Sequence, residues 1–138
     1  MLLTAAAAAA ATLIACNAPP VHDGDTLRCA GERVRLFGVD APELRRGKTP
    51  AQPFSNEARL ELERLTRGRV ACRFVDRDRY GRFVGTCWSN ASPDVNAAMI
   101  RSGFTTEYRR YSKGQYAKAE AEAKTARRGV WASGAPAR

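Results

Sequence analysis

The chain has 138 residues, of which 44% are hydrophobic and 27% are charged, and its formal net charge is +9. A chain of this length is one domain with a modest core, and it has no apolar run long enough to span a membrane. A strongly basic domain attracts polyanions, most often nucleic acid, although a solvated basic surface has the same composition. The composition therefore leaves both interpretations open.

The N-terminal segment is typical of an export signal. Residues 1–16 are uncharged and largely apolar, and they end in small residues. Residues 13–16 resemble a bacterial lipobox, in which Cys16 carries the lipid and becomes the mature N-terminus. The alternatives are cleavage after Ala18, a misplaced start, or a helical polyalanine tail. We expect an exported protein that is periplasmic, secreted or lipid-anchored at the cell envelope.

The four cysteines allow more than one pairing. Cys72 and Cys87 lie at equal distances from one turn, so they face each other if a hairpin forms there. Cys16 and Cys29 flank the turn at Asp23 in the same way. One interpretation therefore has two disulfides in an oxidising compartment. Another has Cys16 lipidated and Cys29 free, and a third has buried thiols, since spacing does not fix connectivity.

Strand and turn residues dominate the first third of the chain. We expect strands at 26–30 and 32–39, separated by a glycine-containing turn. Pro42 ends the second strand because proline has no N–H to donate to a ladder. Residues 44–54 contain prolines and basic side chains, and we expect them to form a mobile loop.

The rest of the chain predicts helices on either side of one β-hairpin. Cap residues, apolar spacing and glycine stops indicate the helices. Short strands leave exposed edges, so we expect them to close into a small barrel covered by helices. The expected elements are a helix capped by Ser55 and running to about Arg67, strands at 69–76 and 82–88, a helix opened by residues 92–94 and ended by Gly103, a helix over 113–128, Val130 and Trp131 packed on the core, and a flexible tail at 132–138.

Asp25 and Asp40 each stand beside the end of an expected strand. Both offer hard carboxylate oxygens without a soft ligand nearby, which favours Ca²⁺ or Mg²⁺ over Zn²⁺. Two carboxylates leave coordination positions for a carbonyl, water and a substrate phosphate, as Lewis-acid catalysis requires. Asp-Gly and Asp-x-Pro are also common turn sequences, so either aspartate alone is weak evidence.

A carboxylate and two arginines extend this constellation. Glu43 follows Asp40 by three residues, and in a turn this spacing aims both carboxylates at one cavity. Glu43 is therefore a candidate to orient or deprotonate an attacking water. Arg35 and Arg82 are candidates for a phosphate clamp, because a planar guanidinium contacts two phosphate oxygens at once. Each residue alone is also explained as an ordinary surface charge.

Tyrosines supply candidate nucleotide contacts. Tyr80, Tyr108 and Tyr111 lie among charged residues, a pattern that favours stacking on bases over core packing. Together with the carboxylates and arginines, they predict an enzyme that cuts phosphodiester bonds.

The motifs that carry these residues, in their order along the chain, resemble those of the staphylococcal-nuclease-like (thermonuclease) family. The resemblance covers about residues 21–131 and implies one domain at 17–131. It implies an α+β, mostly β fold: an OB-type five-stranded barrel with about three helices. The matching segments are DGDT at 23–26, RLFGVDAPE at 35–43, EA at 57–58, DRYGR at 78–82, VNAAMIRSG at 95–103 and AEAEAKTARRGVW at 119–131.

The resemblance also implies roles for individual residues. It implies one calcium ion bound by Asp25, Asp40 and the Ala41 carbonyl, with the acid of Asp23 nearby. The positions matched to phosphate, water and nucleotide contacts are Arg35, Arg82, Glu43, Arg79, Tyr80, Tyr108 and Tyr111.

The expected function follows from this resemblance. The family hydrolyses DNA and RNA with little sequence selectivity and leaves 3′-phosphates. We therefore expect an exported calcium-dependent nuclease that acts as a monomer on DNA and RNA. The alternatives are a non-catalytic OB-fold nucleic-acid-binding protein and a lipoprotein domain with a basic surface. The chain departs from the family before Asp23, where the first strand must be short, irregular or taken from the N-terminal segment.

Overall fold

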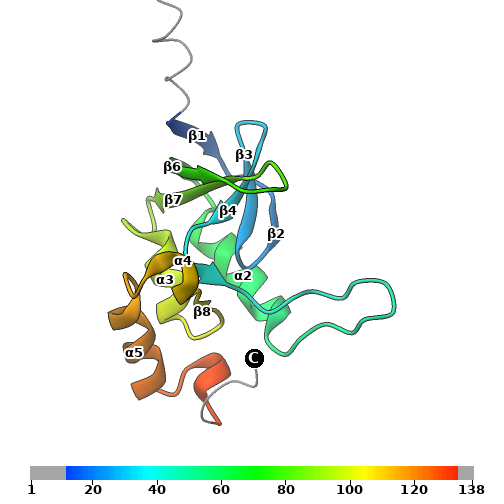
Figure 1. Ribbon diagram of the computed structural model, residues 1–138, viewed down its shortest axis with the longest axis vertical. Coiled ribbons are helices and arrows are strands. Elements are labelled where there is room, and N and C mark those ends of the chain that lie inside the picture. Colours follow the sequence, from blue (N-terminus) through cyan, green and yellow to red (C-terminus); the bar gives the residue numbers. More distant parts are fainter. Residues whose placement is uncertain (1–11, 134–138) are drawn as a thin grey trace, which may run out of the picture.

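The computed structural model describes residues 12–133 and shows a curled sheet covered by helices (Figure 1). The mixed, mostly β fold that the sequence predicts is confirmed. The strands are β1 (Leu13–Asn17), β2 (Val21–Asp23), β3 (Thr26–Cys29), β4 (Glu32–Leu36), β5 (Val39–Asp40), β6 (Arg69–Arg77), β7 (Phe83–Ser89) and β8 (Thr106–Glu107). The helices are α2 (Ser55–Leu65), α3 (Val95–Arg101), α4 (Arg109–Ser112), α5 (Ala117–Thr125) and the 3₁₀ turn η1 (Gly129–Trp131).

The main sheet has the strand order β1-β6-β7-β4-β3-β2, and β5 pairs with β8 in a separate two-stranded sheet. The predicted hairpin is present as β6 and β7, and the strands predicted at 26–30 and 32–39 are present as β3, β4 and β5. β4 and β7 run parallel, whereas the other neighbours in the main sheet are antiparallel. The parallel pair places β4, from the first third of the chain, beside the β6–β7 hairpin.

The first strand is built from the apolar N-terminal segment. β1 pairs with β6 from Leu13 opposite Arg73 to Asn17 opposite Arg69. Ile14 packs against the core, as the alternation of a half-buried strand requires. Most of the expected export signal, residues 1–11, lies outside the described residues, as do residues 134–138 of the expected tail.

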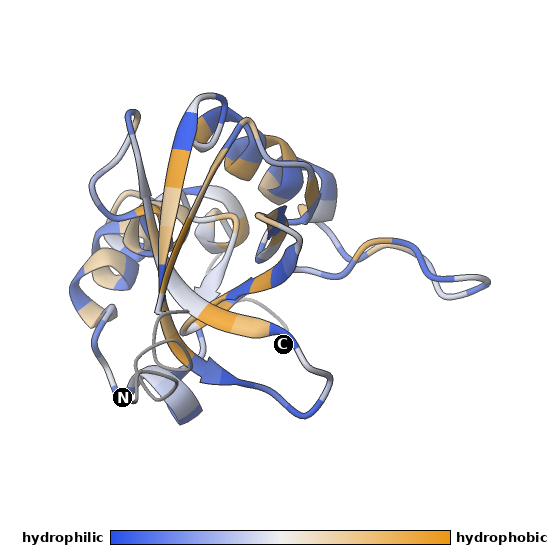
Figure 2. Ribbon diagram, turned by 90° about the horizontal axis from the view of Figure 1, so that it is seen from above, coloured by the Kyte–Doolittle hydropathy of each residue, from blue (hydrophilic) through white to orange (hydrophobic). Residues whose placement is uncertain are grey.

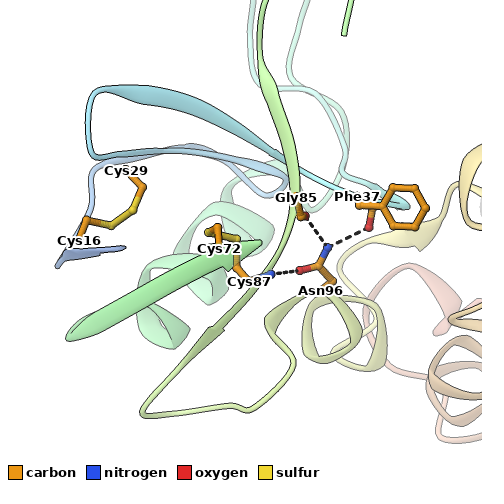
Figure 3. The surroundings of a disulfide bond; sticks show 7 residues. All are labelled: Cys16, Cys29, Phe37, Cys72, Gly85, Cys87 and Asn96. Atoms are coloured by element: carbon orange, nitrogen blue, oxygen red, sulfur yellow. Dashed lines mark hydrogen bonds between the residues drawn. A yellow bond between two sulfur atoms is a disulfide. The ribbon is translucent and has the colours of Figure 1, made fainter. Parts of the chain in front are cut away.

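Two disulfides connect the strands (Figure 3). Cys72 and Cys87 are directly opposite on β6 and β7, and their sulfurs are 2.09 Å apart, so this predicted pair is confirmed. Cys16 is bonded to Cys29, which joins β1 to β3 across the curl of the sheet. Residues 12–133 contain no free cysteine. Lipidation of Cys16 needs the same sulfur, so the disulfide seen here and a lipid anchor exclude each other.

The core fills the space between the sheet and helices α2 and α3. Leu27, Val34 and Leu36 enter it from the sheet, and each is at most 1% exposed. Leu62 of α2 and Met99 of α3 meet them and are fully buried. Burial of such side chains stabilises a fold by about 1.5–3 kcal/mol each. This packing holds the strand ends that carry the candidate site.

A buried asparagine fastens helix α3 to the sheet. Asn96 is fully buried, and its side-chain oxygen accepts the N–H of Cys87 at 2.9 Å. Its amide donates to the carbonyls of Phe37 at 2.9 Å and Gly85 at 3.1 Å (Figure 3). These bonds help to satisfy backbone groups beside the parallel strand pair, where the Gly85 carbonyl also accepts the N–H of Phe37 at 2.8 Å.

Two helices begin differently from the sequence prediction. The N-cap of α2 is Phe54, in the left-handed region at φ 70°, and Ser55 is a buried helical residue whose side chain makes no cap. Packing overrides the usual cap preference, because the Phe54 ring contacts a buried C-terminal cluster. Helix α3 is capped by Asp94, whose carboxylate accepts the N–H of Ala97 at 3.0 Å, and not by the serine two residues earlier.

The predicted C-terminal helix begins only at Ala117. Lys113 and Gly114 have φ values of 56° and 89°, which interrupts the helix after α4. The buried carboxylate of Glu107 accepts the N–H of Tyr116 at 2.8 Å and so fixes this irregular connection. The contact joins residues from β8 and the turn before α5, and helical periodicity does not reveal it.

The end of the chain packs apart from the main core. Val130 and Trp131 are buried, as predicted, and they pack in a small second hydrophobic cluster with Ala123 and Phe54. Residues 44–54 form the predicted loop, which projects away from the body in both ribbon views (Figures 1 and 2). Within residues 12–133, no helix has the length and apolarity to cross a membrane.

Candidate active site

The turn between β2 and β3 presents Asp25 at the centre of the site. Its Oδ1 accepts the hydroxyl of Thr26 at 2.9 Å, and its Oδ2 accepts the N–H of Ala41 at 2.9 Å. The second bond links residues sixteen positions apart in sequence. It therefore holds the Asp25 turn against the end of β5, which carries Asp40.

A glycine allows this turn to pack closely. A Cβ at Gly24 would lie 2.6 Å from the Cβ of Ala58 in α2 and 2.9 Å from the Cβ of Ala41. Both distances are far below van der Waals contact, so only glycine fits without a shift of the backbone. The small residues at these three positions thus set the distance between the turn, helix α2 and the end of β5.

Arg35 stands beside Asp25. Its Nη1 lies 3.2 Å from Asp25 Oδ2, and their side chains are only 16% and 10% exposed. The same nitrogen donates to the carbonyl oxygens of Val39 and Leu36. Among the described residues, these partners engage Nη1 only, so the guanidinium is fixed while its Nε and Nη2 retain donors for an oxyanion.

A second carboxylate enters the same cluster. The Oδ1 of Asp23 accepts the N–H of Asp25 at 3.1 Å. Burial, followed by the negative charge of Asp25, raises the pKa of Asp23 to about 7, and the Arg35 charge offsets this only in part. A proton or a cation that neutralises Asp23 is therefore favoured near neutral pH.

These residues fit an oxygen-ligated cation. Asp23 and Asp25 supply hard carboxylate oxygens, and the N–H of Ala41 lies against Asp25. Within the described part of the chain, no three His, Cys, Asp or Glu side chains gather as a metal cluster. The assignment of Asp25 and Asp40 as direct ligands of the ion stays a prediction.

Glu43 lies at the base of the projecting loop. Its carbonyl accepts the N–H of Gln52 at 2.8 Å, and its own N–H donates to Gln52 Oε1 at 2.8 Å. Its carboxylate is 65% exposed and lies 3.7 Å from a guanidinium nitrogen of Arg46. No described contact joins Glu43 to Asp25 or Arg35, so the role predicted for Glu43 stays a prediction.

The tip of the β6–β7 hairpin positions Arg82. The Asp78 carboxylate accepts the N–H groups of Tyr80 and Arg82 at 2.9 Å each, and the Arg82 Nε at 2.7 Å. Burial raises the pKa of Asp78, but these hydrogen bonds and the Arg82 charge outweigh it and leave the pKa below its ordinary value. The sequence analysis assigned Asp78 no role, although an aspartate opening a tight turn before an arginine was a usable signal.

Strand register brings the two predicted clamp arginines to one face. Arg35 of β4 lies opposite Val84 of the parallel strand β7. Arg82 precedes Val84 by two residues, and side chains two apart on an extended chain point to the same face. This register places Arg82, one residue before β7 begins, on the same face of the sheet as Arg35.

The predicted tyrosines form two exposed groups. The ring of Tyr80 is 65% exposed, and the guanidinium groups of Arg79 and Arg82 lie 5.0 and 5.5 Å from its centre. The rings of Tyr108 and Tyr111 meet edge to face with centres 4.9 Å apart. The Nη2 of Arg79 donates to the Tyr80 hydroxyl at 2.9 Å, and this hydrogen bond raises the pKa of Arg79.

The structure thus assembles most of the predicted residues in two clusters. Asp23, Asp25, Arg35 and Ala41 are joined by direct contacts. Arg79, Tyr80 and Arg82 form the hairpin-tip cluster, and Asp78 joins it as a residue that the sequence analysis missed.

The chain is similar in sequence to known proteins. A protein-family model described as "Staphylococcal nuclease homologue" matches residues 33–133. The chain is 41% identical over 143 residues to the "Succinoglycan biosynthesis protein ExoI" of Rhizobium meliloti (strain 1021), a match that covers 95% of this chain and 71% of that protein.

Two further relatives carry nuclease names. The "Probable staphylococcal-like nuclease CAN3" of Oryza sativa subsp. japonica is 37% identical over 106 residues, covering 75% of this chain and 26% of that protein. The "Probable endonuclease LCL3" of Schizophyllum commune (strain H4-8 / FGSC 9210) is 37% identical over 118 residues, covering 73% and 40%. The chain spans less than half the length of these two relatives. It belongs to the staphylococcal nuclease homologue family.

Proposed function

We propose that this protein is an exported, calcium-dependent nuclease that hydrolyses phosphodiester bonds of DNA and RNA. It cuts with little sequence selectivity and leaves 3′-phosphates. The observation that carries the proposal is the fixed contact between Asp25 and Arg35, with Arg82 on the same face of the sheet. The nuclease names of the rice and fungal relatives support the same activity.

The two arginines form the phosphate clamp. A phosphodiester under in-line attack gains negative charge on its oxygens, and preorganised donors stabilise that charge. Asp25 and two backbone carbonyls fix Arg35, whereas Asp78 fixes Arg82. Each such donor contributes a factor of about 10²–10³ in rate.

Asp25, Asp40 and the Ala41 carbonyl would hold a calcium ion, and the charge of Asp23 would strengthen the site. A bound calcium ion supplies Lewis-acid chemistry by neutralising charge on the phosphate. The Asp25 carboxylate also keeps the guanidinium of Arg35 oriented, because its Oδ2 contacts the Arg35 Nη1.

Glu43 orients the attacking water and accepts its proton. The paired hydrogen bonds between Glu43 and Gln52 fix the backbone from which this carboxylate extends. Its exposure leaves it accessible to water and substrate in the free protein, and catalytic hydrogen bonds often tighten only when substrate binds.

The surface charge and the tyrosines account for broad substrate choice. A net charge of +9 attracts any polynucleotide through its phosphates, which carry no sequence information. Stacking of a base on an exposed ring such as Tyr80 contributes about 1–3 kcal/mol and is equally tolerant of sequence.

The disulfides support an exported protein. Cys16–Cys29 and Cys72–Cys87 account for every cysteine in the chain, and such bonds persist in oxidising compartments outside the cytosol.

The test is degradation of plasmid DNA and of RNA by the purified full chain, first with Ca²⁺ and then with a chelator. We expect cleavage in Ca²⁺ that the chelator stops, with 3′-phosphates on the product ends. Tight, salt-sensitive binding without cleavage would instead assign the protein to the non-catalytic OB-fold binders and overturn the proposal.

A further inference from the structure

Two arginines outside the predicted site face each other on the outer surface of the sheet. Arg28 of β3 lies directly opposite Arg33 of β4, and both are exposed. Within residues 12–133, neither has a carboxylate partner in an ion pair. Like charges directly opposite on an antiparallel pair destabilise the sheet. The fold therefore carries a repulsive pair that a bound anion would relieve.

A pocket of about 410 Å³ adjoins this pair. The N–H of Arg28 donates to the Pro20 carbonyl at 2.9 Å, which brings the chain before β2 alongside β3. A pocket of this size that combines apolar and charged groups is typical of small-ligand sites. Its lining includes Pro20, Val21, His22, Leu27, Arg28 and Arg33.

The pocket lies beside the candidate active site and shares a residue with its hydrogen-bond network. Thr26 also lines it, and the Thr26 hydroxyl donates to Asp25 Oδ1. Thr26 lies opposite Arg35, so the next pair on that face is Arg28 and Arg33. Side chains two apart on a strand are separated by about 7 Å along the strand. The arginine pair thus lies one step along the same face from the predicted phosphate clamp.

We propose that this pocket binds one nucleotide of the polynucleotide chain beside the nucleotide at the cleaved bond. Arg28 and Arg33 hold its phosphate, because two guanidinium groups can each offer paired N–H donors to the oxygens. Val21 and the ring of His22 offer the base or sugar a partly apolar surface. This assignment rests on the proposed function, since it extends the path of the same substrate.

The subsite predicts a row of arginines across neighbouring strands. Arg28 and Arg33 continue the face that already carries Arg35 and Arg82. A single strand bound along this row places successive phosphates on successive arginines. Substrates of several nucleotides therefore reach arginines that a dinucleotide does not, and the difference appears in affinity and in KM.

The test compares two double variants of the full chain that lose equal charge. Arg28→Gln with Arg33→Gln removes the proposed subsite. Arg67→Gln with Arg69→Gln is the matched control, because these exposed residues lie at or before the start of β6, the end opposite the hairpin tip. The probe is a fluorescent single-stranded DNA of ten nucleotides, titrated in a chelator so that it is not cut.

We expect the Arg28/Arg33 variant to bind this DNA about tenfold or more weakly than the control variant, as loss of hydrogen bonds to a charged group implies. The slope of log affinity against log salt should also fall in magnitude by about 0.7 for each phosphate that the variant no longer neutralises. With Ca²⁺, its KM should rise more for the ten-nucleotide strand than for a dinucleotide.

Equal losses of affinity in the two double variants, or wild-type affinity in the Arg28/Arg33 variant, would overturn the subsite. Thermal unfolding distinguishes a structural role of Arg28 and Arg33 from a role in binding. Because their replacement relieves repulsion, the melting temperature of the Arg28/Arg33 variant should be at or above that of wild type. A lowered melting temperature with unchanged DNA affinity would also count against the proposal. If the wild type binds DNA without cutting it, the proposed function fails, and the affinity comparison still decides the subsite.

Discussion

The carboxylate of Asp78 accepts two hydrogen bonds from Arg82: Oδ2 accepts the guanidinium Nε–H at 2.7 Å, and Oδ1 accepts the backbone N–H at 2.9 Å. Both side chains are about one-fifth exposed, so the pair is partly shielded from solvent. A clamp residue held in this way keeps its orientation before substrate arrives. Asp78 is thus a positioning residue for the predicted phosphate clamp.

Replacement of Asp78 should lower activity through Arg82. We expect Asp78→Ala to reduce kcat roughly tenfold or more, because part of a donor's contribution to the transition state depends on its orientation. Glu61→Ala is the control, since it breaks an exposed ion pair with Arg64 elsewhere on the surface. If both variants keep wild-type kcat on single-stranded DNA, Asp78 does not position the clamp.

Glu43→Gln should separate chemistry from binding. The amide keeps the size of the side chain but cannot accept a proton, so kcat should fall by a factor of about 10²–10⁴. DNA affinity measured in a chelator should stay near wild type, because Glu43 supplies no positive charge. Glu57→Gln on the exposed face of α2 is the control. A Glu43 variant that cuts at nearly the wild-type rate would remove this residue from the mechanism.

The raised pKa of Asp23 predicts that the stability of the protein, kept free of metal by a chelator, depends on pH. Its folded-state pKa is about 7, against an ordinary value of 3.8. A raised carboxyl pKa contributes stability that is fully present below about pH 3.8 and is lost as the pH rises through about 7. The free energy of unfolding of wild type relative to Asp23→Asn should therefore decrease between pH 4 and pH 8.

Urea unfolding at several pH values measures this difference. Asp76→Asn is the control, because Asp76 is exposed on β6. A wild-type stability that tracks the Asp23 variant at every pH would contradict the raised pKa.

Loss of the Cys16–Cys29 bond should destabilise the fold. The bond closes a segment of thirteen residues, for which chain entropy predicts about 3 kcal/mol. Cys16→Ser with Cys29→Ser should lower the free energy of unfolding by roughly this amount in denaturant titrations. The intact mass of the protein isolated from cells reports the state of Cys16 directly. An added lipid mass would contradict the disulfide, whereas loss of four hydrogen atoms relative to the fully reduced chain agrees with both disulfides.

The Asn96 network should be intolerant of change. Asn96→Ala would remove the acceptor of the buried Cys87 N–H and the donor to the Phe37 carbonyl, while the Gly85 carbonyl would keep only the N–H of Phe37 at 2.8 Å. Each unsatisfied group costs about 1–3 kcal/mol, so we expect a loss of several kcal/mol in unfolding free energy. Asn90→Ala, at an exposed position, is the control, and equal stabilities of the two variants would refute this role.

Local patterns were enough for much of the fold. The hairpin of β6 and β7 follows from β-rich runs around a tight turn, and the equal spacing of Cys72 and Cys87 about that turn indicated their bond. Most site residues also lie in short motifs at strand ends, where carboxylates and arginines are conspicuous. Such features depend on neighbours in the sequence.

Features set by distant contacts were not predictable. Helix α5 starts late because Glu107 fixes the connection before it, and Phe54 replaces the expected serine cap because its ring packs on the C-terminal cluster. The repulsive pair of Arg28 and Arg33 belongs to no motif and emerges only from strand register. Asp78 gains its role only once the hairpin tip places it around Arg82.

The Cys16–Cys29 bond affects the order in which the first strand joins the fold. The strand partner of Leu13 is Arg73 of β6, which lies far along the sequence. The disulfide partner of Cys16 is Cys29, which lies only 13 residues away. In an oxidising compartment, this short-range bond can therefore fasten the first strand to β3 before β6 folds beside it. The covalent link turns a late, long-range pairing into the docking of a segment already held nearby.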